Sequence, residues 1–407
     1  MAIEQISASL VVLLLLAFIA EPLSRLIRLP YSSVLVLLGF VVSELVVRSG
    51  FDTGVRADNF HDLIFYVFIP VLVFESAYKI NKTRLLHNIV PIIFLAVFGL
   101  LLTATITAVG LYYGIAHAVG FPLIAALLSG AILAATDPVA VVTRLREIGA
   151  PDRLRILLEG ESLFNDAAAI VLFGLFISMA LSMENSISVS DAIAEFLTIF
   201  LGGLLTGLIA GLITGLLAKL VKSDSMTGML SLMLAYGSYL LAEELLHVSG
   251  VMSTLAAAIV MSAMLNRQSG KTALMKTEYL WDVTGHIANA IVFIVMGVTI
   301  TLSMFEERWL AMLIAIAAVL VARAISTYGS LSLLGLFQRE PIDLRHQTVM
   351  VWGGLRGAVA LALALSLPVT LDYWWTIQSI AFGVVLFTLF VQAPTIHWVV
   401  NKLGLRH

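Results

Sequence analysis

Residues Ala134-Ala135-Thr136-Asp137-Pro138 interrupt one long apolar stretch of the chain, and Trp352-Gly353-Gly354-Leu355-Arg356-Gly357 interrupt another. Pro138 cannot donate a helical hydrogen bond and crowds the carbonyl one turn before it. The three glycines of the second stretch loosen a helix. Each break also carries an ionisable residue, Asp137 or Arg356, which is costly inside a bilayer unless it is used. Irregular backbone at membrane depth persists only where it is packed in protein or lines a cavity. The two breaks therefore indicate a membrane protein with a functional site built around them.

The composition excludes most soluble classes of protein. Of the 407 residues, 60% are hydrophobic and only 12% are charged, whereas soluble domains are about a quarter charged. A soluble enzyme of this composition would expose apolar surface and aggregate. Lys and Arg number 23 against 26 Asp and Glu, so no basic excess attracts nucleic acid. Because there is no cysteine, disulfides, thiolate metal sites and cysteine nucleophiles are excluded.

Apolar stretches long enough to cross a bilayer recur along the whole chain. Such a crossing takes about 20 residues. The first stretch has no basic segment before it, so we expect a mature helix rather than a signal peptide. We predict an all-α membrane protein with about thirteen spans, over residues 6–24, 31–48, 61–79, 88–113, 122–143, 155–183, 190–220, 226–246, 249–266, 280–303, 308–335, 346–367 and 374–401.

The positions of Lys and Arg support this number of spans. Eighteen of the 23 fall in one set of alternate loops, and only Arg48, Arg56 and Arg308 fall in the other set. Arg323 and Arg356 lie inside apolar spans. By the positive-inside rule the richer set is cytoplasmic, which predicts an N-terminus outside and a C-terminus in the cytoplasm.

The two interrupted spans are the fifth and the twelfth, seven spans apart. We therefore predict one transmembrane unit over residues 1–407, made of repeat one (6–183), a linking span (190–220) and repeat two (226–401), with no soluble regulatory domain. Because seven is odd, the repeats have inverted topology and their discontinuous helices cross. This arrangement is typical of secondary transporters, whose site lies at the crossing.

The sixth span carries the densest polar pattern within the apolar stretches. Helical spacing places Glu161 beside Asn165, and Ser162 beside Asp166. A buried acid must be paired, metal-bound or protonated. Arg323 and Arg356 are the bases available to Glu161 within the membrane, and spacing alone does not choose between them. Arg356 is expected to neutralise a helix end, because a cation site repels arginine.

Asp137 and Asp166 are left without an evident permanent counter-ion. Such a carboxylate can hold a proton or a small hard cation, but hardly both. Sodium takes oxygen ligands, as other hard cations do. The sequence predicts a Na⁺ site formed by the Asp166 carboxylate, the Ser162 hydroxyl, the Asp137 side chain and the carbonyl of Thr136. One such site, open alternately to each side, is an antiporter.

Three motifs together resemble the sodium/proton exchangers of the cation/proton antiporter superfamily. They are Gly160-Glu161-Ser162-Leu163-Phe164-Asn165-Asp166, the Thr136-Asp137-Pro138 break and Gly353-Gly354-Leu355-Arg356-Gly357. The nearest likeness is to NhaP-type proteins, which are kin to the animal sodium/proton exchangers. The resemblance covers essentially the whole chain.

The resemblance implies a role for several residues. Asp166 is then the carboxylate that binds ion and proton, and Asn165 belongs to the asparagine–aspartate pair that accompanies electroneutral one-for-one exchange. Thr136 and Asp137 lie at the crossover.

It also implies a pair between Glu161 and Arg323, with Arg356 near the second break. Glu75 resembles an acid that some prokaryotic members place on the cytoplasmic ion path. A simple pair between Glu75 and Lys79, one turn later, is an alternative reading.

The resemblance further implies a homodimer in the plasma membrane, surrounded by lipid and moving small cations. No cofactor is expected beside the transported Na⁺ or Li⁺ and H⁺. Three other transport activities stay open at this stage: potassium/proton antiport on the same fold, sodium-coupled symport of an organic anion with a pocket at Arg356, and a channel. A membrane-bound enzyme is the weakest alternative, because the sequence has no nucleophile elbow and no phosphate loop.

Overall fold

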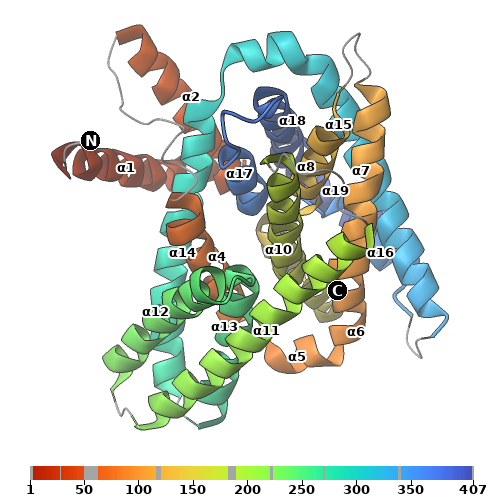
Figure 1. Cartoon of the computed structure of the whole chain (residues 1–407). Coiled ribbons are helices and arrows are strands. Elements are labelled where there is room, and N and C mark those ends of the chain that lie inside the picture. The colour runs from red at the N-terminus through yellow and green to blue at the C-terminus, as the bar shows by residue number, and fades with distance from the viewer. Residues whose placement is uncertain are drawn as a thin grey trace.

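The structure is a computed structural model that describes residues 3–27, 29–49, 63–115, 121–181, 189–220, 223–268, 271–337 and 341–405. All the regular structure in these residues is helical, which confirms the predicted all-α fold class (Figure 1). The chain contributes a first group of helices, the long helix α11 (Val189–Leu220), and a second group.

The first group corresponds to the predicted first repeat. Its elements are α1 (Ile3–Ile27), α2 (Tyr31–Ser49), the π-helical turn η2 (Ile64–Phe68) continuing into α4 (Ile69–Lys79), α5 (Lys82–His87), α6 (Ile89–Phe94), the π-helical turn η3 (Leu95–Gly99), α7 (Leu100–Gly114), α8 (Leu123–Ala134), α9 (Val139–Glu147) and α10 (Asp152–Leu181).

The second group corresponds to the predicted second repeat. Its elements are α12 (Asp224–Leu240), the π-helical turn η4 (Leu241–Leu245), α13 (Gly250–Gln268), α14 (Lys271–Thr299), α15 (Leu302–Gly335), α16 (Leu344–Trp352), α17 (Ala358–Leu365), α18 (Trp374–Phe387), the π-helical turn η5 (Thr388–Gln392) and α19 (Ala393–Lys402).

Helices lie at each of the thirteen stretches that the sequence marks as spans. Within the described residues, nine segments are apolar helices long enough to cross a bilayer, and Tyr31–Leu45 and Gly250–Leu265 form shorter apolar helices. The remaining two stretches are the one made of η2 and α4 and the one split between α16 and α17. Both predicted breaks are present: residues 135–138 separate α8 from α9, and residues 353–357 separate α16 from α17. The exact number of spans stays a prediction.

The helices form two bodies. Each body contains helices that are distant in the sequence but close in space. The frame consists of α1, α2, α4 and α11–α14, and the core consists of α5–α10 and α15–α19; most of the close helix pairs lie within one body. In Figure 1, α11 runs diagonally across the front of the frame. The predicted repeats are therefore interleaved, because each repeat gives its first helices to the frame and its last helices to the core.

Glycines let helices of the frame approach to backbone contact. A Cβ on Gly39 of α2 would overlap the Ile294 carbonyl oxygen of α14, and one on Gly297 of α14 would overlap the Val36 carbonyl oxygen. Along α11, a Cβ on Gly207 would overlap the Ser253 carbonyl oxygen of α13. Lipid chains are as apolar as leucine, so helices in a bilayer associate through such close packing.

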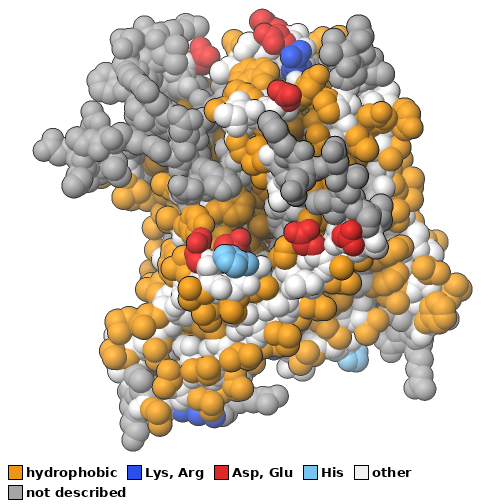
Figure 2. All heavy atoms as spheres, in the orientation of Figure 1, with side chains coloured by type: hydrophobic (Ala, Val, Ile, Leu, Met, Phe, Trp, Pro, Cys, Tyr) orange, Lys and Arg blue, Asp and Glu red, His pale blue; other side chains and the backbone are white. Residues whose placement is uncertain are grey.

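The outer surface is predominantly apolar. Figure 2 shows hydrophobic side chains over most of the visible flanks, with charged side chains in small groups. Along α11, Leu201, Leu205 and Ile209 are exposed, as expected of a lipid-facing helix.

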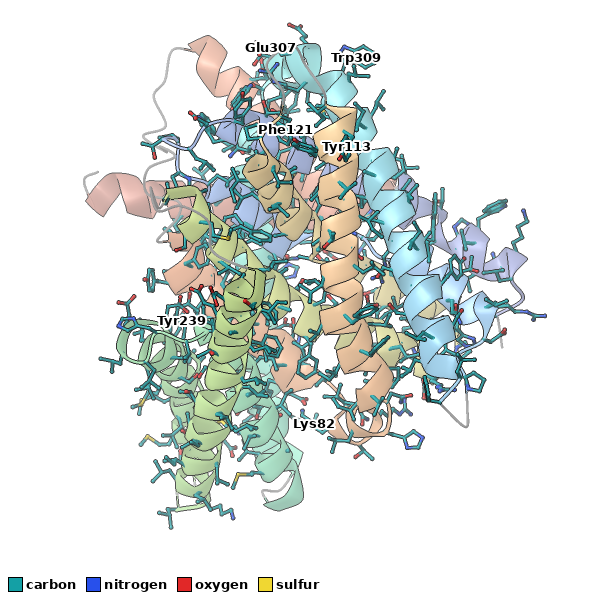
Figure 3. The ribbon with its side chains drawn as sticks, turned by 45° about the vertical axis from the view of Figure 1, so that its right-hand side comes forward. Lys82, Tyr113, Phe121, Tyr239, Glu307 and Trp309 are labelled. Carbon is teal, nitrogen blue, oxygen red and sulfur yellow. The ribbon has the colours of Figure 1, made fainter. Side chains whose placement is uncertain are left out.

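Residues that the prediction assigns to opposite sides of the membrane lie toward opposite ends of the structure (Figure 3). Figure 3 shows Lys82 at one end, and Glu307 and Trp309 at the opposite end. Lys82 belongs to the loops predicted to be cytoplasmic and Glu307 to the exterior. Several of the counted basic residues lie outside the described part of the chain: Arg28, Arg56, Lys222, Arg339 and Arg406. The orientation itself therefore stays a prediction.

Candidate functional site

The two broken helices cross and are bonded to each other at the crossing. The backbone N–H of Asp137 donates to the carbonyl oxygen of Leu355 over 2.8 Å. Gly357 allows this approach, because a Cβ there would overlap the carboxylate of Asp137. The helix breaks thus bring residues 135–138 and 353–357 together at one point of the core.

Opposite charges neutralise the helix ends that meet at this crossing. An Asp137 carboxylate oxygen accepts from the N–H of Val139, the first residue of α9, over 2.9 Å. The N–H of Ala358, which opens α17, also faces that carboxylate. A carboxylate near helix N-termini is stabilised by the helix dipole. Asp137 is therefore partly committed to the crossing itself.

Arg356 performs the complementary task at the C-terminal end of α8. Its Nη1 donates to the carbonyl oxygens of Ala134 and Ala135 over 2.7 and 2.9 Å. The side chain is fully buried, and its Nε and Nη2 have no hydrogen-bond partner. This placement matches the expectation that Arg356 neutralises a helix end.

The buried acid Glu161 on α10 pairs with Arg323 on α15, and not with Arg356. Arg323 donates from both terminal nitrogens to the two carboxylate oxygens, with Nη2 at 2.9 Å from Oε2. The same Nη2 donates to the Met350 carbonyl oxygen of α16 over 3.2 Å. Breaking a buried pair of this kind costs about 3–5 kcal/mol of stability, because the remaining charge is left without a partner.

Asp166 differs from both of the other buried acids of the core. It lies on α10, one turn after Ser162, and its Oδ1 is buried without a hydrogen-bond partner. The Thr136 N–H faces its carboxylate, and the Ser162 hydroxyl donates to the Thr136 carbonyl oxygen. Asp166 thus has no bonded base and stands beside a hydroxyl and a carbonyl of the broken helix.

A cavity of about 540 Å³ gives access to Asp166. Five of the predicted site residues line it, namely Asp166, Asp137, Ser162, Thr136 and Glu75. Asn165 is buried and does not line the cavity. Its Oδ1 has no partner. Arg323, Arg356 and Glu161 also lie outside the cavity wall.

The cavity reaches one end of the molecule. Its wall includes Lys79, at the end of α4, and Arg146, on α9. Both belong to the loops predicted to be cytoplasmic. The cavity therefore connects Asp166 to that predicted side.

Sequence reasoning missed several polar and charged residues of the cavity wall. Asp282 and Asn289 of α14 and Glu159 of α10 line it, and none of them was expected in the site. His286 of α14 lines it too and stacks on the Tyr31 ring at 4.9 Å. The signal for Asp282 is an acid just inside a predicted apolar span. Lys79 contacts Glu75, which corresponds to the alternative reading of that acid.

The arrangement suits a transient cation better than a resident metal. Among the described residues, no group of three or more His, Asp or Glu side chains is placed to hold a metal ion. One carboxylate, one hydroxyl and one carbonyl offer oxygen ligands to a hard cation. The same carboxylate is the natural acceptor of a proton when the cation leaves.

Comparison with known proteins gives a consistent result. The family model described as "Sodium/hydrogen exchanger, transmembrane" matches residues 11–402. The chain is 36% identical over 405 residues to the Na⁺/H⁺ antiporter ApNhaP of Aphanothece halophytica, covering 99% of this chain and 75% of that one. It is 30% identical over 404 residues to the Na⁺/H⁺ antiporter NhaH of Halobacillus dabanensis, covering 97% of both. The fold is similar to the sodium proton antiporter MjNhaP1 of Methanocaldococcus jannaschii at pH 8, with a TM-score of 0.84, 20% identity and 99% of both chains covered.

Proposed function

Because this chain belongs to the sodium/hydrogen exchanger family, we propose that it is a Na⁺/H⁺ antiporter that works by alternating access. The resemblance to NhaP-type proteins drawn from the three motifs is confirmed by the family match and by the similarity to ApNhaP. One site serves both ions: Na⁺ and H⁺ compete for the Asp166 carboxylate, and one ion of each kind is exchanged per cycle.

One observation carries this proposal. Asp166 is a core acid that lines the cavity and has one buried carboxylate oxygen without a hydrogen-bond partner. A charge inside a membrane protein is expensive and marks an ion path by default. Glu161 and Asp137 have partners in the same region, so Asp166 is the carboxylate left free to take up an ion.

The ion ligands follow from the groups around Asp166. In the proposed cycle, Na⁺ enters through the cavity and is held by the Asp166 carboxylate, the Ser162 hydroxyl and the Thr136 carbonyl. To bind Na⁺, Ser162 turns its hydroxyl hydrogen away from Thr136. A proton replaces Na⁺ when the site faces the opposite side.

The remaining predicted residues have supporting roles in this proposal. Asp137 completes the negative field at the crossing, and Asn165 supplies a neutral neighbour to Asp166 where a second acid would add another exchangeable proton. Glu75 attracts cations from the cavity wall. Glu161, Arg323 and Arg356 hold the helices that carry the site.

The other transport readings receive less support. Arg356, which an organic anion would need, is fully buried, bonded to two carbonyls and absent from the cavity wall. Potassium/proton antiport uses the same geometry, and an ion panel distinguishes the two.

The proposed cellular setting follows the sequence reasoning. We place the chain in the plasma membrane as a multi-pass protein, with its N-terminus outside and its C-terminus in the cytoplasm. We infer a homodimer, with lipid around it and small cations as its substrate.

The function is tested by the Asp166→Asn variant in proteoliposomes that hold a pH gradient. The asparagine keeps the size of the side chain but removes its charge and its exchangeable proton. We expect Na⁺-dependent dissipation of the gradient to fall to the level of protein-free liposomes.

The matched control is Glu195→Gln, which removes an exposed acid on α11 outside the cavity. This variant should exchange at the wild-type rate. Wild-type activity of Asp166→Asn would refute the proposed role of this carboxylate.

A further inference from the structure

Lys79 holds two acids of the cavity wall together. Its ammonium donates to Glu75, one turn earlier on α4, and forms an ion pair with Asp282 on α14. All three side chains line the cavity that leads to Asp166. The ammonium therefore occupies the position between two carboxylates where a free cation would otherwise be attracted.

The local structure fixes this arrangement in place. Gly285 of α14 makes room for Glu75, because a Cβ there would lie 2.6 Å from the Glu75 Cγ. The Ser76 hydroxyl donates to the other Glu75 oxygen over 3.2 Å. The Glu75 side chain is 20% exposed, so one member of the pair is largely shielded from water.

Lys79 is one of only two Lys or Arg residues among the described residues of the cavity wall, so it has a large effect on the net charge of the cavity. Acids predominate in the cavity wall: Glu75, Asp137, Glu159, Asp166 and Asp282, against the bases Lys79 and Arg146. Arg146 is 70% exposed and its nearest acid, Glu159, is 3.8 Å away. Lys79 is thus the more firmly held of the two bases. A cavity lined by one sign of charge between low-dielectric walls concentrates counter-ions, and Lys79 reduces that effect.

We propose that Lys79 is a tethered cation that sets the apparent affinity of the cavity for the transported ion. This inference rests on the proposed function and adds a specificity-determining residue to it. While Lys79 occupies Glu75 and Asp282, the incoming cation is attracted mainly by the carboxylates of the crossing. Without the ammonium, Glu75 and Asp282 offer a second resting position, and the whole cavity gains one negative charge.

The test replaces Lys79 by Met, which keeps the length of the side chain and removes its charge. Initial rates of Na⁺-driven dissipation of a pH gradient are measured at pH 7.0 over a range of Na⁺ concentrations. We expect the apparent KM for Na⁺ to fall about three- to tenfold, as one added charge at this range permits. The difference should shrink when choline chloride raises the ionic strength, because salt screens the added field.

Three further variants separate this effect from a structural one. Lys79→Arg keeps the charge and should keep the wild-type KM. Lys79→Met with Asp282→Asn removes one charge of each sign and should return the KM toward the wild-type value.

The third variant, Lys82→Met, is the matched control, because it removes a nearby lysine charge from outside the cavity wall. Lys82 opens α5, donates to the Tyr78 carbonyl and lies outside the cavity wall. Burial lowers the pKa of Lys82 to about 8, so at pH 7.0 this substitution also removes a charge. Its KM should stay unchanged.

Equilibrium binding of ²²Na⁺ to detergent-solubilised protein makes the inference independent of turnover. Tighter binding by Lys79→Met than by wild type is the expected result. An unchanged KM and unchanged binding in folded Lys79→Met protein would overturn the inference. Failure of the wild type to exchange Na⁺ for H⁺ would instead refute the proposed function, and the binding comparison would still decide the role of Lys79.

Discussion

Three buried acids of the core show how neighbours decide what a carboxylate can do. Glu161 is bonded by both terminal nitrogens of Arg323, and Asp137 accepts from the start of α9. Both carboxylates therefore have hydrogen-bond partners supplied by the protein itself. Asp166 has an oxygen with no partner, so in the proposed cycle an ion from solution completes its environment.

In the proposed cycle Na⁺ and H⁺ compete for this carboxylate, so we expect the exchange to be sensitive to pH. If Na⁺ and H⁺ share Asp166, lowering the pH on the cation side should raise the apparent KM for Na⁺. In the range where Asp166 titrates, the KM should rise in proportion to the proton concentration, up to tenfold per pH unit, while the maximal rate changes little. Initial rates over a range of Na⁺ concentrations up to saturation, repeated at several pH values, measure both quantities. A KM that is constant over the whole active range would contradict a shared site.

At the residue scale the sequence predicted the charged pattern better than the pairing. Asp137, Glu161, Asp166, Arg323 and Arg356 were each visible as an ionisable residue in an apolar stretch. The choice of Arg323 for Glu161 was not fixed by spacing, because it depends on how α15 and α10 face each other. Asp282 was overlooked for the same reason: its sequence neighbours do not reveal that α14 faces α4 across Lys79.

Crossing helices make the site at the scale of elements. Four helix ends meet where α8–α9 and α16–α17 are broken. The Asp137 carboxylate accepts from the start of α9, and Arg356 donates to carbonyl oxygens at the end of α8. The π-helical turn η5 supports the crossing, since the Thr388 hydroxyl accepts from the Arg356 N–H over 3.3 Å. A wide turn of this type often marks a functional region.

The crossing tolerates no side chain at Gly357, which gives a direct test. Gly357→Ala would place a Cβ against the Asp137 carboxylate, so the two broken segments must separate. We expect the variant to lose Na⁺/H⁺ exchange. We also expect its free energy of unfolding to fall by about 1–3 kcal/mol, as for an overpacked core, so that it unfolds at a lower temperature. Thermal unfolding in detergent and exchange in proteoliposomes measure the two effects.

Gly329→Ala is the control on α15. A Cβ there meets no atom within 4 Å, so stability and exchange should equal those of the wild type. If Gly357→Ala behaves like this control, the crossing is not as tight as described.

The breaks were predictable from sequence, whereas the π-helical turns were not. Proline and clustered glycine disrupt a helix wherever they occur, and their effect can be assigned from composition. The turn η3 contains Gly99, and Pro394 follows η5 two residues later. Such residues disturb a helix, but they do not by themselves distinguish a π-helical turn from another bend.

The whole molecule consists of a frame and a core that share one cavity. The frame supplies Glu75, Lys79 and Asp282, and the core supplies Asp137 and Asp166. The sequence predicted the all-helical fold and the two interrupted stretches, whereas the exact number of spans stays a prediction. It did not predict which helices belong to which body, because the periodicity of an almost wholly apolar helix does not reveal its neighbours.

Because Glu161 and Asp137 have fixed partners, the proposal predicts how the exchange rate depends on membrane potential. In the proposed cycle Asp166 alone exchanges its ion, so the loaded core would have the same net charge with Na⁺ as with H⁺. We expect the exchange rate to be independent of membrane potential. Proteoliposomes clamped with valinomycin and potassium at two potentials should give equal rates. A clear dependence on potential would reveal a second titrating acid, with Asp137 the first candidate.

The glycines of the frame have a consequence for the proposed cycle. Backbone contacts at Gly39 and Gly297 join α2 to α14, and those at Gly207 join α11 to α13, so we expect the frame to stay rigid in the proposed cycle. Lys79 lies on this rigid frame, whereas Asp166 lies on the core, which moves in the proposed cycle. Each movement of the core would then change the distance between the Lys79 ammonium and the Na⁺ bound at Asp166. The affinity for Na⁺ would consequently depend on the position of the core as well as on the ligands. It would be lowest where Na⁺ comes nearest to the Lys79 ammonium.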